Sequence, residues 1–450
     1  MIGSEPTLFT LAADLAAGRT SSRALTDACL SRIADDGGNG GNAYTLVDAQ
    51  GARAAADAMD QLRAAQAAPS PFAGIPISVK DLFDVQGQVT TAGSKLLAGA
   101  APATEDAVAV ARLRRAGFVV LGRANMTEFA YSGLGLNPHY GTPLNPWDRE
   151  VGRAPGGSSS GGAVSVALAM AHASLGTDTG GSCRIPAAFM GLTGFKPTAT
   201  KVPSTGAIPL SPALDAIGPI ARSVRCCAAL DAVLADEPLH LSSAPVVRGL
   251  RFVVPTTVAL DTLDAEVAQA FERALGRLSK AGAYIQEAAF PEFDDIARLN
   301  AKGGFTAAES YAWHRGYIAT SRDQYDPRVI SRIERGAHQT AADYLDLIAG
   351  RAALISAAQL RMAHYDGLLM PSVAIIAPRM ADLMDDSDYA RLNLLALRNA
   401  TIINMIDGCA VSIPVHEQGE APVGLMLCGT HGNDRKVLAL GCALEDYLGA

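Results

Sequence analysis

Two glycine-rich stretches that contain serine, and one lysine, are the residues whose types and spacing could do chemistry. Residues 156–162 read GGSSSGG, and residues 176–186 read GTDTGGSCRIP. The two glycines before Ser182 let the backbone turn sharply and direct several N–H groups into one space, which is how an oxyanion hole is built. Lys80 follows the apolar run IPISV. Taken alone, such a lysine is usually a surface residue or an ion-pair partner.

Other chemistries that these patterns could serve have less support. A flexible linker does not fit GGSSSGG, because a helix of small residues follows it directly at 161–172. A phosphate-binding loop requires GxxxxGK[ST], and no lysine stands at that point. Ser182 lacks the GxSxG elbow of a Ser–His–Asp hydrolase. The sequence contains no HExxH, no Cys–His cluster and no GxGxxG that opens a strand–helix unit, so we expect neither a metal nor a cofactor.

Together the stretches resemble the amidase signature family. GIPISVKD at 74–81 is similar to the lysine motif of that family, and the two glycine-rich stretches are similar to its serine-rich signature. The likeness continues through GLTGFKPT at 191–198 and SPALDAIGP at 211–219. It is dense over residues 70–225 and sparse elsewhere.

The resemblance implies a catalytic triad of two serines and a lysine. Ser182 matches the nucleophile and Lys80 matches the base. The bridging serine, which the family holds in a cis peptide, is the one followed by Ser-Gly, which here is Ser159. Ser158 is its rival, because three serines stand in a row. Cys183 replaces the aliphatic residue common after the nucleophile, and we interpret it as a packed small residue.

The loop around Ser182 supplies the supporting groups that we expect. Asp178 and Arg184 flank it with opposite charges, and we expect them to hold its shape. The oxyanion donors that we expect are the backbone N–H groups of Thr179, Gly180, Gly181 and Ser182.

A lysine base must be uncharged, although its reference pKa is about 10.4, so it must be desolvated. The apolar run before Lys80 predicts a strand that delivers this side chain into the interior. Helical patterns at 105–116 and 265–280 alternate with strand patterns at 118–121 and 284–289, which is typical of an α/β protein. We therefore expect a single large α/β domain, a mixed twisted β-sheet covered by helices on both faces.

Three segments divide this expected amidase domain of residues 1–450: an N-terminal helical segment (1–69), the signature catalytic core (70–225) and a helical substrate-pocket region (300–365). Tyr131, Ser132 and Leu134 precede a long loop and are candidates to line the pocket, with a place in the core as the equal alternative for Tyr131. If the helices at 300–345 cover the site, their aromatic residues favour a hydrophobic or aryl substrate. These are Phe305, Tyr311, Trp313 and Tyr317.

Composition excludes several partners. The net charge is −8, which argues against a basic groove for nucleic acid. The apolar stretch 163–175 is too short to span a membrane, and no secretory signal is visible at the N-terminus, so we expect a cytoplasmic monomer or homodimer. The seven cysteines show no CxxC spacing and are expected to be reduced.

The expected activity is hydrolysis of a small-molecule amide, with anilides, carbamates and esters open to the same serine chemistry. The alternative from the same family is the glutaminase (A) subunit of a tRNA-dependent amidotransferase. A non-catalytic binding protein would require Lys80, Ser159 or Ser182 to be missing, and all three are present.

Overall fold

One mixed sheet runs through the described part of the chain. The computed structural model describes residues 5–35, 39–240 and 245–449. Their strands form an 11-stranded sheet in the order β1-β3-β2-β4-β6-β5-β10-β11-β9-β7-β8. The strands are β1 (Tyr44–Val47), β2 (Pro76–Lys80), β3 (Val119–Ala124), β4 (Ser174–Asp178), β5 (Thr193–Lys196), β6 (Ala216–Ala221), β7 (Arg251–Pro255), β8 (Tyr284–Ala288), β9 (Gly367–Pro371), β10 (Cys409–Pro414) and β11 (Gly424–Gly429).

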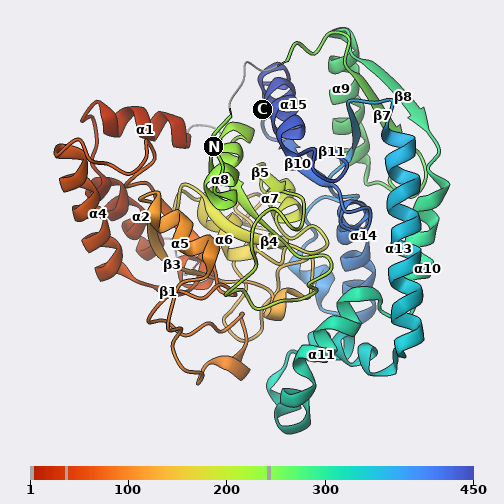
Figure 1. Ribbon diagram of the computed structural model, residues 1–450, viewed down its shortest axis with the longest axis horizontal. Helices are drawn as coiled ribbons and strands as arrows, with labels where there is room; N and C mark the ends of the chain where they lie inside the picture. The colour runs from red at the N-terminus through yellow and green to blue at the C-terminus, as the bar shows by residue number, and fades with distance from the viewer. Residues whose placement is uncertain (1–4, 36–38, 241–244, 450) are drawn as a thin grey trace.

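Helices cover this sheet. The α-helices are α1 (Leu8–Ala16), α2 (Ser22–Asp35), α3 (Asn39–Ala43), α4 (Ala49–Ala64), α5 (Val108–Arg115), α6 (Ser160–Ala167), α7 (Arg184–Phe189), α8 (Val224–Ala235), α9 (Ala265–Lys280), α10 (Asp295–Leu299), α11 (Gly304–Ser321), α12 (Pro327–Ile333), α13 (Ala341–Met362), α14 (Asp386–Met405) and α15 (Asp434–Leu448). The 3₁₀ turns are η2 (Lys95–Leu97), η3 (Glu128–Ala130), η4 (Pro291–Asp294), η5 (Arg322–Gln324), η6 (Glu334–His338) and η7 (Met380–Leu383). Figure 1 shows α1, α2 and α4 on one side of the molecule and α13 on the opposite side, with α11 projecting at one end.

Side-chain alternation shows that both faces of the sheet are covered. Successive side chains of a strand point to opposite faces. In β11, Leu425 and Leu427 belong to one buried apolar cluster, whereas Met426 and Cys428 belong to another. The parallel strands β2, β3 and β4 are buried at every position, as expected for strands between two helical layers. The predicted α/β domain with helices on both faces is confirmed.

Local sequence explains several of these elements. α9 matches its predicted bounds and buries residues at helical spacing, namely Val267, Ala270, Phe271, Ala274 and Leu278. α13 begins with a capping box, in which Thr340 and Asp343 each bind the backbone N–H of the other. α6 is shorter than the predicted helix at 161–172, because Ala169 adopts a left-handed backbone conformation (φ 51°). None of the helices in the described ranges combines the length and apolar character that crossing a bilayer requires.

Candidate active site

The ends of neighbouring strands bring the predicted lysine and serines together. β2 and β4 are parallel neighbours, and the carboxyl ends of parallel strands meet at the same edge of a sheet. Lys80 is the last residue of β2, and the loop that carries Ser182 begins directly after β4. α6 runs between β3 and β4 and therefore begins at this edge, within the run of three serines at 158–160.

Lys80 is fully buried and binds two hydroxyl groups. Its Nζ donates to Ser158 Oγ (2.7 Å) and to Thr177 Oγ1 (2.8 Å). No carboxylate of the described residues forms an ion pair with it. Burial lowers the pKa of Lys80 from 10.5 to about 8, against smaller opposing effects of nearby acidic groups. About a tenth of the Lys80 side chains are therefore uncharged at pH 7.

The contact with the lysine falls on Ser158, so the expectation for Ser159 is wrong in its geometry. The cis peptide bond joins Gly157 and Ser158, one residue earlier than expected. Ser159 is the N-cap residue of α6, and its Oγ lies 3.5 Å from the carbonyl oxygen of Thr177. Its side chain is thus directed to the backbone of β4 and makes no hydrogen bond to Lys80. The run of three serines could not distinguish these two positions.

Ser182 is nearly buried, and its Oγ makes no hydrogen bond to another described residue. It lines a cavity of about 550 Å³ together with Thr179 and Gly180. Gly181 has a φ of 124°, and a Cβ added there would lie 2.5 Å from the Cβ of Ala400. Only glycine fits this position.

One of the expected oxyanion donors is already engaged. The N–H of Gly181 donates to Asp178 Oδ1 (2.9 Å), so it is not free for a substrate. The N–H groups of Thr179, Gly180 and Ser182 make no hydrogen bond within the described part of the chain. These three remain candidates, and the inclusion of Gly181 is corrected. The sequence did not reveal this because the engaged and free donors are neighbours in one loop.

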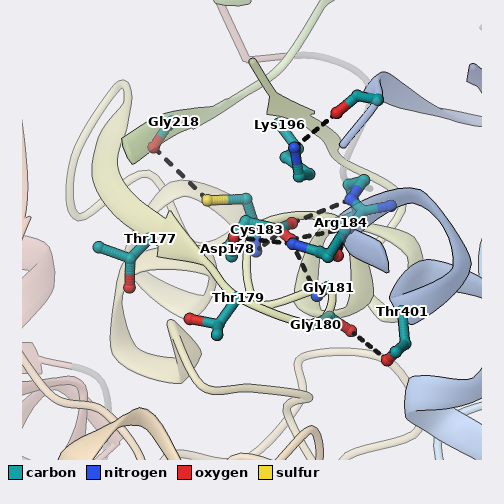
Figure 2. A network of polar contacts seen from close by, with 12 residues as sticks. Thr177, Asp178, Thr179, Gly180, Gly181, Cys183, Arg184, Lys196, Gly218 and Thr401 are labelled. Carbon is teal, nitrogen blue, oxygen red and sulfur yellow. Dashed lines mark hydrogen bonds and ion pairs between the residues drawn. The ribbon is translucent and has the colours of Figure 1, made fainter. Parts of the chain in front are cut away.

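A buried ion pair supports the loop (Figure 2). Arg184 donates through Nε and Nη2 to the two carboxylate oxygens of Asp178 (2.9 and 2.7 Å), and both side chains are fully buried. Burial acts to raise the pKa of Asp178, but Arg184 and its neighbours outweigh this effect and lower it to about 2. The carboxylate also accepts the N–H of Cys183, and Arg184 donates to Asn404 Oδ1 (2.7 Å) on α14.

We expect the substitution Arg184→Met to lower the free energy of unfolding by about 3–5 kcal/mol, because it leaves the Asp178 carboxylate buried and unpaired. The measurement is urea unfolding of the purified variants. The double variant Asp178→Asn/Arg184→Met removes both charges, and we expect it to be more stable than the single variant. If the single variant proves at least as stable as the double one, the ion pair does not support the loop in this way.

Cys183 is packed, in agreement with its interpretation from the sequence. Its side chain is fully buried, and its Sγ donates to the carbonyl of Gly218 (3.5 Å; Figure 2). Burial raises the pKa of the thiol. A protonated, enclosed thiol is a poor nucleophile, so this group does not compete with Ser182.

Tyr131 and Ser132 line the cavity as expected, and Leu134 does not. The hydroxyl of Ser132 accepts a hydrogen bond from Tyr389 (2.7 Å) and donates to Asn393 Oδ1 (2.9 Å), so α14 fixes its position. Leu134 is fully buried in an apolar cluster with other core residues, which is the usual place for a leucine.

The segment 300–345 also contributes to the cavity wall, but not through its aromatic residues. The contributing residues are Asn300, Gly303, Thr306, Arg332 and Arg335. The four aromatic residues pack elsewhere: Phe305 lies in a buried core cluster, Tyr311 and Trp313 pack against the main core, and Tyr317 stacks on Trp313. The argument that these rings favour an aryl substrate is therefore wrong.

Other contributors were missed in the sequence. Thr177 binds the lysine, and Thr179 Oγ1 donates to Asp215 (2.5 Å), whose pKa burial raises to about 6. Thr177 and Thr179 lie in the motif at 176–186, and Asp215 lies in the motif at 211–219. The motifs were therefore the only indication in the sequence that these residues belong to the site. One face of α14 lines the cavity through Leu397, Arg398, Thr401, Ile402 and Met405. Nothing in the sequence of that helix indicated its role.

Comparisons with known proteins agree over nearly the whole chain. The family model described as Amidase matches residues 24–438. The 2-amino-5-chloromuconic acid deaminase of Comamonas testosteroni is 37% identical over 413 residues, covering 91% of this chain and 89% of the deaminase. The A subunit of the glutamyl-tRNA(Gln) amidotransferase of Symbiobacterium thermophilum is 32% identical over an alignment of 466 residues, covering 95% of this chain and 94% of its own length. A crystal structure of an amidase has a TM-score of 0.89 at 34% identity and covers 98% of this chain and 99% of its own.

Proposed function

This chain belongs to the amidase signature family of hydrolases that act on C–N bonds, and we propose that it cleaves a small-molecule amide with Ser182 as its nucleophile. The observation that carries the proposal is the buried Lys80, which has a lowered pKa and lies 2.7 Å from the hydroxyl of the buried Ser158. A lysine base needs this desolvation and a hydroxyl partner.

The proton relay runs through Ser158. Uncharged Lys80 takes the proton of Ser158 Oγ, and Ser158 takes the proton of Ser182 Oγ as that oxygen attacks the substrate carbonyl. Catalytic hydrogen bonds often tighten only when the substrate is bound, and the relay requires this of Ser158 and Ser182. The same relay then runs backward and protonates the leaving amine, which leaves an acyl-enzyme on Ser182. Water repeats the cycle and releases the acid.

The oxyanion of each tetrahedral intermediate is stabilised by backbone N–H groups. Those of Thr179, Gly180 and Ser182 are free of other partners among the described residues. The Asp178–Arg184 pair holds the loop in shape and thereby fixes the direction of these donors before the substrate binds. Preorganised donors of this kind contribute about 3–4 kcal/mol each to transition-state stabilisation.

We expect the substitution Ser158→Ala to reduce kcat by about 100- to 1000-fold, because it removes the hydroxyl that connects lysine and nucleophile. Ser159→Ala removes a neighbouring hydroxyl of similar burial that does not bind Lys80, and we expect a loss below about tenfold. The kcat of each variant is measured on the same amide, and each purified variant is first checked for folding. A larger loss in Ser159→Ala would return the bridging role to Ser159.

The function itself is tested by release of ammonia, amine or alcohol from a panel of substrates. The panel holds a primary aryl amide, an anilide, an aryl carbamate, an ester and glutamine. Cleavage of the neutral amides by the protein alone supports a free-standing amidase. No cleavage of any of them, with or without added partner proteins, would contradict the proposal.

The second candidate is the glutaminase component of a tRNA-dependent amidotransferase, and the similarity to such a component over 95% of the chain favours including it. In that case glutamine is the substrate, and its hydrolysis depends on partner proteins. The similarity to the deaminase is somewhat higher, at 37% identity, and it favours a free-standing hydrolase. Activity on glutamine alone, or only after the partner proteins are added, would select the amidotransferase component.

The body of the substrate is apolar. Much of the cavity wall consists of aliphatic and aromatic side chains, including Leu210, Leu214, Val258, Phe293, Ile296 and Met405. Cavities of this volume hold ligands of the size of a substituted aromatic ring. The proposal therefore keeps the hydrophobic substrate that the sequence led us to expect, but it rests on these cavity residues and not on the aromatic residues of 300–345.

A further inference from the structure

Three arginines line the cavity that holds Ser182, and no acidic residue of the described chain does. The arginines are Arg332, Arg335 and Arg398. None of them forms an ion pair with a described residue, although most arginines of this protein do. The net charge of the whole chain is −8, so this local excess of positive charge does not follow from composition.

Two of these arginines have unused hydrogen-bond donors. Arg332, half-buried at the end of α12, donates to the carbonyl of Tyr131 (2.6 Å), and Arg335 donates to the carbonyl of Ala301 (2.8 Å). A guanidinium has five N–H donors, so most of them remain free on both residues. Arg398 donates through three nitrogen atoms to Asn399 and to the carbonyls of Ala259 and Asp261, and it contributes mainly charge.

Arg332 is held where it can face a ligand. Its guanidinium lies over the ring of Tyr389 (5.4 Å), and the hydroxyl of Tyr389 binds Ser132 on the cavity wall. Arg335 stands three residues later, on the 3₁₀ turn η6 that directly follows α12, and it lines the same cavity. Arg398 stands one turn before Thr401, whose hydroxyl contacts the carbonyl of Gly180 (3.4 Å) in the loop of the nucleophile. The positive charge therefore lies within the same cavity as the reacting serine.

We propose that the substrate is an amide that also carries a carboxylate, and that Arg332 and Arg335 bind this carboxylate. The inference rests on the proposed function and adds the substrate class to it. Guanidinium groups that have free donors and no ion-pair partner, at the wall of a mostly apolar cavity, are suited to bidentate binding of a carboxylate. The apolar wall holds the body of the molecule, and the scissile carbonyl lies at Ser182.

The test uses two probes of nearly equal shape, 4-carbamoylbenzoate and 4-isopropylbenzamide, which differ in the carboxylate. Binding is measured by calorimetry to the protein with Ser182→Ala, so that no turnover occurs. We expect 4-carbamoylbenzoate to bind at least tenfold more tightly. Arg332→Gln and Arg335→Gln, each placed in this background, are expected to reduce that preference by about 10- to 100-fold. Equal binding of the two probes, or a preference that both variants retain, would overturn the proposal.

The matched control is Arg315→Gln. Arg315 lies on α11, which also borders the cavity, but it is exposed and does not line the cavity. Its loss removes the same charge from the same region, and we expect the preference for the carboxylate to be unchanged. An equal fall in the preference would mean that general electrostatics and not the cavity arginines favour the anion, which also contradicts the proposal.

Failure of the amidase proposal can be distinguished from failure of the substrate-class proposal. If the wild-type protein cleaves neither the panel amides nor 4-carbamoylbenzoate, while the carboxylate preference depends on Arg332 and Arg335, the cavity binds carboxylates and the amidase proposal is wrong. If the neutral amides are cleaved and no carboxylate preference exists, the amidase proposal stands and the substrate class is wrong.

Discussion

Replacing Ser182 with alanine is expected to reduce kcat for an amide substrate by about 10⁶-fold, the loss that follows when a serine hydrolase loses its nucleophile. Ser182 lines the cavity and its Oγ has no hydrogen-bond partner among the described residues, so this oxygen is free to attack a carbonyl. Its removal leaves the backbone donors and the cavity in place, and substrate binding should therefore persist. The measurement is single-turnover product release, together with the dissociation constant of an unreacted substrate.

Cys183→Ala is the control for this experiment, because the thiol is the neighbouring alternative nucleophile and is fully buried. We expect this variant to keep its rate within a few-fold. A serine-directed fluorophosphonate should label wild-type protein on the peptide that carries Ser182 and should not label Ser182→Ala. Substantial turnover by folded Ser182→Ala would exclude this residue as the nucleophile.

Replacing Lys80 with methionine is expected to reduce kcat by about 10³- to 10⁴-fold, because among the described residues only Lys80 forms a hydrogen bond with Ser158 Oγ. Methionine keeps most of the apolar stem in the buried site. The loss should be larger for an amide than for an aryl ester, since an amine must be protonated to leave and an aryl alcohol need not be. The two rates are compared on an amide and an ester of the same acid.

The pH profile of the wild type gives an independent measure of the same group. Only uncharged Lys80 can accept a proton, and its pKa of about 8 leaves about a tenth of the molecules active at pH 7. The value of kcat/KM should rise about tenfold per pH unit below that pKa and level off above it. A profile that is flat between pH 6 and 9 would contradict a lysine base.

Lys196→Met is the matched control for Lys80→Met. Lys196 is also fully buried, and burial likewise lowers its pKa to about 8. Its Nζ donates to the carbonyls of Pro197 and Gly408, not to a serine. We expect Lys196→Met to reduce stability, because two buried carbonyls lose their donor, but to keep the rate per folded molecule. An equal loss of rate in both variants would show that the effect reports folding and not proton transfer.

Local patterns predicted much of the catalytic edge. The apolar run 75–79 predicted a buried strand that ends in Lys80, and the glycines before Ser182 predicted a sharp turn with inward N–H groups. These features depend on neighbours in the sequence. A strand of five residues fixes the direction of its last side chain, and Gly181 fixes a turn that no residue with a Cβ could adopt.

Contacts between distant residues could not be predicted in the same way. Ser158 and Ser159 differ in their contact with Lys80, which depends on where α6 begins. The N–H of Gly181 donates to the side chain of Asp178 and is therefore not free for a substrate, although both residues belong to one motif. The cavity wall comes from helices whose apolar patterns resemble those of ordinary core helices, so neither the arginines nor the face of α14 could be identified beforehand.

The separation of the two parts of the site along the chain has an evolutionary consequence. Lys80 ends β2, Ser158 precedes α6 and Ser182 follows β4, whereas Arg332, Arg335 and Arg398 stand on later helical segments. Mutations in those later helices can exchange one substrate for another while the reacting groups keep their geometry. Such a division allows related proteins to diverge in the substrate that they bind while they keep one set of groups at the strand edge.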